Sequence, residues 1–193
     1  MMKEYIIATN NKHKVEEISL ALGDSIKLVT LRELGHKKDI PETSDTLKGN
    51  AQQKAQYIYT KFGKDCFADD TGLEVEALNG EPGVYSARYA GDRCSFEENI
   101  DKLLEEMTGK TNRKASFKTV ICLIEDGKEF YFEGECKGSI TTERYGKKGF
   151  GYDPVFIPNG YGESFAEMNL GEKNKISHRG LAVENLVKHL LKK

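Results

Sequence analysis

Three carboxylates in this chain of 193 residues have the chemistry of a hydrolytic site: Glu42 and the adjacent pair Asp69 and Asp70. The pair follows the apolar run Cys66–Ala68, and burying two neighbouring carboxylates is unfavourable unless cations compensate their charge. Mg²⁺ is the usual partner of carboxylates near phosphates, and a carboxylate there can also deprotonate an attacking water. Side chains of neighbours on a strand point to opposite faces, so each aspartate can serve a different partner. A capping Asp-Thr-Gly turn explains the same residues about equally well.

The segment Thr9–Lys14 is a candidate for binding phosphate. It lies at the junction of a predicted strand and helix, where unpaired N–H groups and the helix dipole favour an anion. Small polar side chains and two lysines suit such a turn, although the glycines and the Gly-Lys-Ser/Thr run of a P-loop are missing. Spacing alone favours the simpler alternative of a capped helix with solvated lysines.

The segment Lys148–Pro154 is a candidate for holding a planar ligand. Gly149 and Gly151 flank Phe150 and free the backbone to bring the aromatic ring close to a base. Stacking on an aromatic side chain contributes about 1–3 kcal/mol per base and is indifferent to base identity. Taken alone, the segment is more simply a turn whose Phe150 belongs to the core.

The segment Glu172–Gly180 can read the identity of a base. Lys173, His178 and Arg179 concentrate hydrogen-bond donors at one loop-to-helix junction. A 6-oxo purine presents acceptors at O6 and N7, whereas the 6-amino group of adenine would leave such donors unpaired. The alternative is a solvated, basic helix start in which His178 is a capping residue.

Composition excludes several classes of protein. Hydrophobic residues make up 38% of the chain and charged residues 31%, so it can bury a core and is not disordered as a whole. The formal net charge of −2 and the lack of a basic stripe disfavour a nucleic-acid partner. No apolar run is long enough for a signal peptide or membrane span, and the cysteines and histidines lack zinc-ligand spacing. We therefore expect a cytoplasmic protein with reduced thiols and no membrane partner.

In the first part of the chain, strands alternate with helices, and these elements must position the candidate residues. Hydrophobic patterns predict strands over 5–9, 26–31 and 66–68. A helix follows the first strand, and a long helix capped by Thr46 precedes the third. Pro41 argues against regular structure in the polar segment between the second strand and the long helix.

Later elements pair as a hairpin. A capping box at Ser95–Glu98 starts an amphipathic helix with Phe96 on its apolar face. Strands over 115–124 and 129–136 flank Asp126-Gly127, a strong hairpin signal, and an amphipathic helix closes the chain. Early alternation and a late hairpin indicate an α/β protein with a mixed sheet, not a purely doubly wound one.

With its candidate segments in this order, the sequence resembles the inosine triphosphate pyrophosphatase family, whose members are also called XTP/dITP diphosphatases. The resemblance runs from about residue 5 to residue 187, nearly the whole chain. It is carried by motifs in the family's order: Thr9–Lys14, Ile40–Thr43 with Asn50-Ala51, Ala68–Ala77, Pro82–Gly91, Gly149–Ile157, Phe165–Met168 and Lys173–Gly180.

The resemblance implies hydrolysis of the deaminated purine nucleoside triphosphates ITP, dITP and XTP between the α and β phosphates. The products would be a monophosphate and pyrophosphate, and the nucleotide pool would be cleansed of deaminated purines. The resemblance also implies a Mg²⁺ cofactor, for which Mn²⁺ can substitute, and a homodimer. It implies a two-lobed α/β fold with a long central mixed β-sheet flanked by helices and a nucleotide cleft between the lobes. Residues 1–193 would form one domain whose lobes do not fold independently.

By position, the resemblance assigns a role to each candidate residue. Asp70 falls on the proton acceptor, and Glu42 with Asp70 on the metal ligands; from the chemistry of the pair, we expect Asp69 to support the site. The implied substrate-binding residues are Thr9, Asn10, Asn11, Lys12, His13, Lys14, Thr71, Phe150, Gly151, Tyr152, Asp153, Lys173, His178 and Arg179. Glu33 and Asp39 are alternative carboxylates close to Glu42 in sequence.

Three other functions are alternatives. A pyrophosphatase for modified pyrimidine or methylated nucleotides would share the carboxylates, but the donor cluster of Lys173, His178 and Arg179 favours a 6-oxo purine. A nucleotide sensor could dispense with the carboxylates, and an RNA-binding protein would need a basic stripe. We expect Asp70 to deprotonate the water that attacks the α phosphorus, while Mg²⁺ and Lys14 offset charge on the leaving pyrophosphate.

Overall fold

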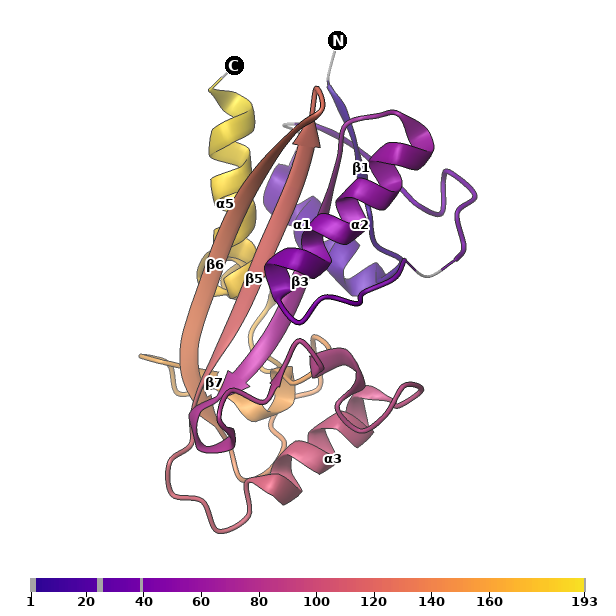
Figure 1. The fold of residues 1–193 in the computed structure, drawn as a ribbon. Coiled ribbons are helices and arrows are strands. Elements are labelled where there is room, and N and C mark those ends of the chain that lie inside the picture. The colour runs from indigo at the N-terminus through magenta and orange to yellow at the C-terminus, as the bar shows by residue number, and fades with distance from the viewer. Residues whose placement is uncertain (1–2, 24–25, 39, 193) are drawn as a thin grey trace. The chain divides into compact units, whose positions relative to one another are not determined.

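The computed structural model describes residues 3–23, 26–38 and 40–192. In this part of the chain a seven-stranded sheet has the order β2-β1-β3-β5-β6-β7, with β4 paired to β3. Figure 1 labels β1, β3, β5, β6 and β7 of this sheet. β1 is parallel to β2 and β3, whereas β4 and β7 pair antiparallel with β3 and β6. The strands are β1 (Glu4–Ile7), β2 (Lys27–Thr30), β3 (Cys66–Val75), β4 (Pro82–Gly83), β5 (Lys114–Glu125), β6 (Lys128–Ile140) and β7 (Phe156–Pro158). The α-helices are α1 (Lys12–Leu22), α2 (Leu47–Phe62), α3 (Phe96–Glu106), α4 (Leu170–Ile176) and α5 (His178–Leu191). The predicted α/β fold with a mixed sheet and flanking helices is confirmed.

The chain divides into two compact units. The first unit consists of Met1–Asp70, Thr119–Gly134 and Arg179–Lys193, and the second of Thr71–Lys118 and Glu135–His178. β3, β5 and β6 each contribute residues to both units, so neither unit is one continuous stretch of sequence. That the two units do not fold independently stays a prediction.

In the first unit, helices cover both faces of the sheet. Tyr5 and Ile7 of β1 pack in one hydrophobic cluster with residues of α1 and α5, while Ile6 packs in another cluster with residues of α2. This alternation follows from the pleat of a strand, which sends successive side chains to opposite faces. Both faces of the strands are therefore buried, as expected of strands flanked by helices on each side.

The strand that carries the aspartate pair is longer than the sequence predicts. We expect a strand that ends at Ala68 and, as one alternative, a turn at Asp69-Asp70-Thr71-Gly72, but β3 continues without interruption to Val75. The turn is wrong because cationic side chains on both faces of the sheet neutralise the two carboxylates. Asp69 and Asp70 therefore lie inside a buried strand.

Local sequence signals place the other elements correctly. The side chain of Asn11 caps α1, that of Thr46 caps α2, and Ser95 and Glu98 form the predicted capping box of α3. The hairpin turn Asp126-Gly127 joins β5 to β6 with φ values of 49° and 74°, as a tight hairpin turn requires. The predicted strand at 26–31 is present as the shorter β2.

The second unit has a core rich in aromatic side chains. Phe117, Phe156 and Phe165 lie with ring centroids 4.7–6.1 Å apart, and the apolar face of α3 packs against the same cluster. Phe96 departs from the prediction, because it is 39% exposed and lies outside this core. α4 precedes α5 as a separate short helix, where the sequence indicates only a loop-to-helix junction.

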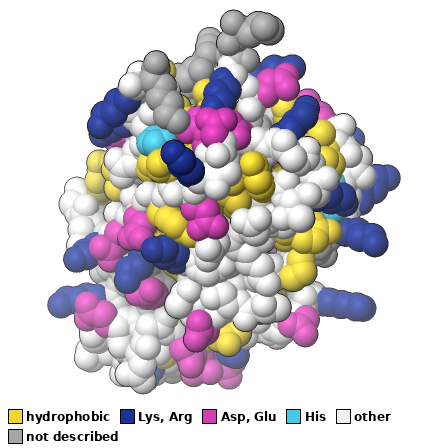
Figure 2. Space-filling view, turned by 45° about the horizontal axis from the view of Figure 1, so that its top comes forward, with side chains coloured by type: hydrophobic (Ala, Val, Ile, Leu, Met, Phe, Trp, Pro, Cys, Tyr) yellow, Lys and Arg dark blue, Asp and Glu magenta, His cyan; other side chains and the backbone are white. Residues whose placement is uncertain are grey.

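The surface carries charges of both signs. On the face shown in Figure 2, basic and acidic side chains are interspersed with small groups of hydrophobic ones, in keeping with the net charge of −2. Among the described residues, no helix combines the length and the apolar composition needed to cross a membrane.

Candidate active site

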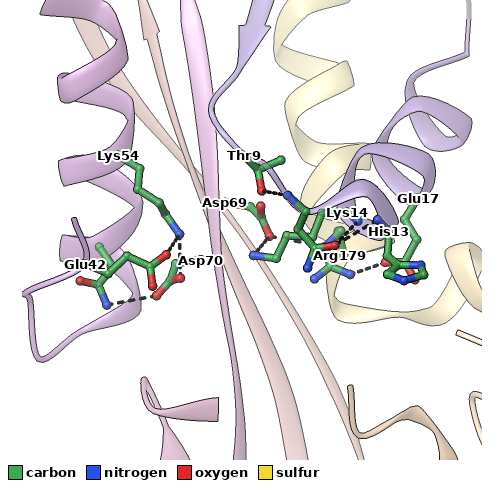
Figure 3. A network of polar contacts seen from close by, with 11 residues as sticks. Thr9, His13, Lys14, Glu17, Glu42, Lys54, Asp69, Asp70 and Arg179 are labelled. Atoms are coloured by element: carbon green, nitrogen blue, oxygen red, sulfur yellow. Dashed lines mark hydrogen bonds and ion pairs between the residues drawn. The ribbon is translucent and has the colours of Figure 1, made fainter. Parts of the chain in front are cut away.

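One face of β3 presents Asp69 to two cations. Asp69 Oδ2 lies 2.9 Å from Lys14 Nζ of α1 and 3.4 Å from Arg179 Nε of α5 (Figure 3). Arg179 Nη1 also donates to Glu17 of α1, and the side chains of Asp69, Arg179 and Glu17 are at most 4% exposed. Lys14, Glu17, Asp69 and Arg179 thus form a buried network of alternating charge.

The network keeps Asp69 ionised. Burial alone would raise the pKa of the Asp69 carboxyl, but the charges of Lys14 and Arg179 outweigh burial and hold this pKa far below its usual range. Burial lowers the pKa of Lys14, an effect that the Asp69 charge opposes. A carboxyl with so low a pKa is a poor proton acceptor, which fits a supporting role for Asp69.

The opposite face of β3 presents Asp70 to a different cation. Lys54 Nζ of α2 lies 2.9 Å from Asp70 Oδ1 and 2.5 Å from Glu42 Oε1 (Figure 3). Asn50 Nδ2, also of α2, lies 3.3 Å from Asp70 Oδ2. Lys54 and Asp70 are buried, whereas Glu42 is half-buried. Glu42 and Asp70 therefore converge on one ammonium group.

Asp70 differs from its neighbour in proton affinity. Burial raises the pKa of the Asp70 carboxyl, Lys54 and Lys14 oppose that rise, and the nearby charge of Glu42 adds to it. Burial lowers the pKa of Lys54, but Asp70 and Glu42 outweigh burial and raise this pKa overall. Neighbouring carboxyls whose pKa values are driven apart are a recurrent arrangement of acid–base sites. Asp70 is the member of the pair that is suited to accept a proton.

The residues around Lys54 fit a hard divalent cation. Glu42 and Asp70 supply oxygen ligands whose positions already converge on a single cationic group. Among the described residues there is no cluster of three or more His, Cys, Asp or Glu that could hold a metal ion by itself. Mg²⁺ characteristically takes one or two carboxylates and completes its ligands with water and substrate phosphates. The donor set is therefore chemically suited to Mg²⁺ held jointly by the protein and a nucleotide.

The predicted phosphate-binding segment forms the N-terminus of α1. Asn11 Oδ1 accepts from the backbone N–H of His13 at 3.0 Å and of Lys14 at 3.4 Å, and Thr9 Oγ1 accepts from the Asn11 N–H at 3.1 Å. Asn10, Lys12 and His13 are exposed, whereas the Lys14 side chain is 15% exposed and points to Asp69. The segment thus places one lysine inside the network and Asn10, Lys12 and His13 at the surface.

In the second unit, a buried ion pair organises the aromatic segment. Asp153 Oδ2 accepts from the backbone N–H of Phe150 at 2.9 Å and from Lys173 Nζ of α4 at 2.6 Å. Lys173 Nζ lies 5.3 Å from the centre of the Phe150 ring, within reach of a cation–π interaction. The structure therefore brings Phe150, Asp153 and Lys173 together, as a common pocket requires.

The remaining predicted residues of this unit lie in or beside its core. His178 stacks on Phe117, with ring centroids 4.5 Å apart and an interplanar angle of 14°. The Tyr152 hydroxyl donates to the backbone oxygen of Ser86 at 2.9 Å. Gly151 has a φ of 60°, and Thr71, in β3, is half-buried. Both aromatic partners, His178 and Tyr152, are buried.

Arg179 has a clear structural role next to the acidic pair. It donates to Asp69 and Glu17 in the first unit, whereas Lys173 and His178 belong to the second unit. These contacts account for Arg179 as a group that neutralises buried carboxylates. That Arg179 donates hydrogen bonds to the edge of a base stays a prediction.

Sequence reasoning missed Glu17, Asn50 and Lys54. Lys54 lies on the apolar face of α2, between Ala51 and Ala55, and a lysine there needs a buried partner. The sequence indicates Asn50 only as part of the Asn50-Ala51 motif and gives it no role. Glu17 could have been found from its place in sequence next to the buried Ile18.

Glu33, one of the two alternative metal ligands, has its described contacts within its own turn. Glu33 Oε2 accepts from the backbone N–H and the hydroxyl of Thr30, both at 2.7 Å, and so closes its own local turn. Asp39 lies outside the described residues. Between Glu33 and Glu42, the two candidate ligands that the structure describes, it is Glu42 that contacts Lys54.

Comparison with known proteins gives consistent matches over almost the whole chain. The model of the Ham1 family matches residues 5–189. A dITP/XTP pyrophosphatase from Flavobacterium psychrophilum is 53% identical over 184 residues, which covers 95% of this chain and 97% of that protein. A dITP/XTP pyrophosphatase from Porphyromonas gingivalis is 53% identical over 191 residues, covering 98% of each.

Solved structures agree with the sequence matches. The Ham1 protein of Staphylococcus aureus superposes with a TM-score of 0.89 at 39% identity, covering 98% of this chain and 99% of that one. A HAM1 protein from Coxiella burnetii gives a TM-score of 0.91 at 39% identity and covers all of both chains.

Proposed function

Because the chain belongs to the Ham1 family, we propose that it hydrolyses the deaminated purine nucleoside triphosphates ITP, dITP and XTP. The bond cleaved is the one between the α and β phosphates, and the products are a monophosphate and pyrophosphate. The observation that carries this proposal is the aspartate pair of β3, in which Asp69 contacts Lys14 and Arg179, and Asp70 contacts Lys54 beside Glu42. The names of the relatives, dITP/XTP pyrophosphatases, support the substrate class.

Asp70 acts as the proton acceptor. Its carboxylate takes a proton from a water molecule whose oxygen forms a new bond to the α phosphorus, while the bond from the α phosphorus to the bridging oxygen breaks. The electron pair of that bond leaves with pyrophosphate. Asn50 and Lys54 hold the Asp70 carboxylate in position by donating to its two oxygens, so it needs little rearrangement on the way to reaction.

Glu42 and Asp70 are the residues that would hold Mg²⁺, or Mn²⁺ in its place. Bound there, the ion would supply positive charge to the triphosphate during cleavage. The N-terminus of α1 and Lys14 bind phosphate oxygens, since N–H groups at a helix start favour anions. Asp69 supports this arrangement by holding Lys14 through their ion pair.

The second unit binds the nucleoside. Phe150 stacks on the base, and Lys173 donates to the acceptors on the edge of a 6-oxo purine. Asp153 accepts from both Phe150 and Lys173 and so sets the positions of the stacking and edge-reading groups together. Such a pocket favours ITP and XTP over ATP, because the 6-amino group of adenine is itself a donor and cannot accept a hydrogen bond from Lys173 as a 6-oxo group can.

The test is product analysis with ITP, XTP, GTP and ATP in the presence of Mg²⁺, separating pyrophosphate from orthophosphate. We expect pyrophosphate from ITP and XTP and little product from ATP. Chelation of divalent ions should abolish turnover, and added Mg²⁺ should restore it. Orthophosphate as the first product would show that a different phosphorus is attacked. Nucleotide binding without turnover on any substrate would instead indicate a sensor.

We also expect the chain to act as a homodimer in the cytoplasm, where nucleotides are consumed by polymerases. This expectation derives from the family resemblance of the motifs. Light scattering coupled to size exclusion should give twice the mass of one chain. A monomeric mass at the concentration of the assay would show that the site works without a partner copy.

A further inference from the structure

Phe96 has an exposed aromatic ring that the start of α3 does not require. The capping box of α3 uses Ser95 and Glu98, and its core contacts come from residues such as Ile100 and Leu103. Phe96 is 39% exposed, and its ring lies 5.9 Å from the ring of Phe150 at an interplanar angle of 50°. This separation and tilt are those of a favourable aromatic pair.

An independent contact ties the start of α3 to the segment that leads to Phe150. Arg144 Nη2 donates to the backbone oxygen of Glu97 at 3.0 Å and to Asp101 Oδ1 at 2.7 Å. Arg144 lies six residues before Phe150, so the first turn of α3 and this segment are joined on both the polar and the aromatic side. The contact between Phe96 and Phe150 is therefore one of the contacts that hold the start of α3 against the segment 144–150 within the second unit.

Phe150 needs such support because the glycines on either side of it can adopt many backbone conformations. Gly149 and Gly151, on either side, have φ values of 73° and 60°. Asp153 fixes the Phe150 N–H, and Lys173 approaches its ring. A ring held in one orientation before the ligand arrives loses less conformational entropy when a base stacks on it.

We propose that Phe96 is a positioning residue for the nucleobase, which it serves by holding the ring of Phe150 in the orientation that stacks. This inference rests on the proposed function, in which Phe150 contacts the base. It gives α3 a part in substrate binding that neither the sequence motifs nor the aspartate pair requires.

The proposal has a distinctive kinetic signature. Stacking is indifferent to base identity, so losing Phe96 should raise KM for ITP and for ATP by the same factor, about two- to tenfold, and leave the ratio of kcat/KM unchanged. Because Phe96 is proposed to act on binding of the base and not on the bond that breaks, kcat should stay constant. Loss of an edge-reading donor would change the ratio instead.

The experiment compares Phe96→Ala with Phe96→Tyr and with Tyr161→Ala, a control that removes another exposed aromatic ring of the second unit. KM and kcat are measured for ITP and ATP, the affinity for α,β-methylene-ITP by calorimetry, and Tm by thermal unfolding. We expect Phe96→Ala to weaken analogue binding and raise both KM values, Phe96→Tyr to restore them, and the control to match the unmodified protein.

An unchanged KM and analogue affinity in Phe96→Ala would overturn the inference, as would a loss confined to ITP or a fall in kcat alone. A lower Tm that Phe96→Tyr does not correct, with normal affinity at low temperature, would show a purely structural role. Failure of the proposed function is separate, because it would appear as absent pyrophosphate release by the unmodified protein.

Discussion

Lys54 Nζ lies 2.9 Å from Asp70 Oδ1, and this contact between two buried side chains joins α2 to the strand that carries the aspartate pair. The same ammonium lies 2.5 Å from Glu42 Oε1. A single cation therefore lies against both carboxylates to which we assign metal binding. Burial raises the pKa of Asp70 and so makes its carboxylate a better proton acceptor, and the charge of Lys54 opposes that rise.

Asp70→Asn should lower kcat for ITP by about two orders of magnitude or more, as loss of a general base typically does. The amide keeps the size of the side chain but cannot take a proton from water. Single-turnover measurement of pyrophosphate release checks the chemical step directly. Asp126→Asn, an equally isosteric change at the hairpin tip, is the control and should leave kcat unchanged. Near-normal turnover in Asp70→Asn would refute the assignment of Asp70 as the base.

Lys54→Met should shift the acid limb of the pH profile of kcat/KM to higher pH. Lys54 lowers the pKa of Asp70, so its removal lets burial and Glu42 raise that pKa further. Because the proposed reaction uses the Asp70 carboxylate as its base, a higher pKa leaves less active enzyme at a given acidic pH. Lys48→Met, on the same helix at an exposed position, should leave the acid limb in place. If both variants give the same profile, Lys54 does not control the ionisation of Asp70.

Elements with local signals could be predicted from the sequence. Asn11 and Thr46 mark helix starts because their side chains bond to the next turn, and Asp126-Gly127 marks a hairpin because that turn needs two residues with positive φ. The length of β3 could not be predicted in this way. Asp69 and Asp70 discourage a buried strand until partners distant in the chain neutralise them.

The same limit applies to the candidate site. The three carboxylates were evident from residue type, and the alternation of a strand correctly indicates that Asp69 and Asp70 serve different partners. Lys54 lies far from them in sequence, and its role depends on the face of α2 that meets β3. Arg179 contacts Asp69 and Glu17, and its sequence proximity to Lys173 could not predict which carboxylates it meets.

Arg179→Met should destabilise the fold by about 3–5 kcal/mol, because it leaves two buried carboxylates with less compensating charge. Glu17→Gln in the same chain should recover part of this loss by removing one of those charges. Denaturant unfolding of the single and double variants measures the effect. Equal stability of Arg179→Met and its double variant would show that Glu17 is not coupled to Arg179.

The two aspartates should affect acid stability in opposite directions. The pKa of Asp69 is lowered in the folded chain, so its contribution to stability is present above the pKa of an unfolded aspartate, about 3.9, and is lost as pH falls below it. In Asp69→Asn, the free energy of unfolding should therefore depend less on pH below about pH 4. The pKa of Asp70 is raised, so ionisation of Asp70 costs stability as pH rises. Asp70→Asn should still lose stability below about pH 4, because Asp69 is intact. A free energy of unfolding that does not change with pH in this range would contradict the opposite pKa shifts of the two aspartates.

Lys173→Met should narrow the preference for ITP over ATP. The buried ammonium of Lys173 donates to Asp153 and is the donor we assign to the acceptor edge of a 6-oxo purine. Without it, ITP loses a hydrogen bond that ATP never made, so the ratio of kcat/KM for ITP to that for ATP should fall about tenfold or more. Lys175→Met, at an exposed position of the same helix, should keep the ratio. If Lys173→Met slows both substrates equally, the lysine orders Phe150 and Asp153 without contacting the edge of the base, and selectivity must come from another donor.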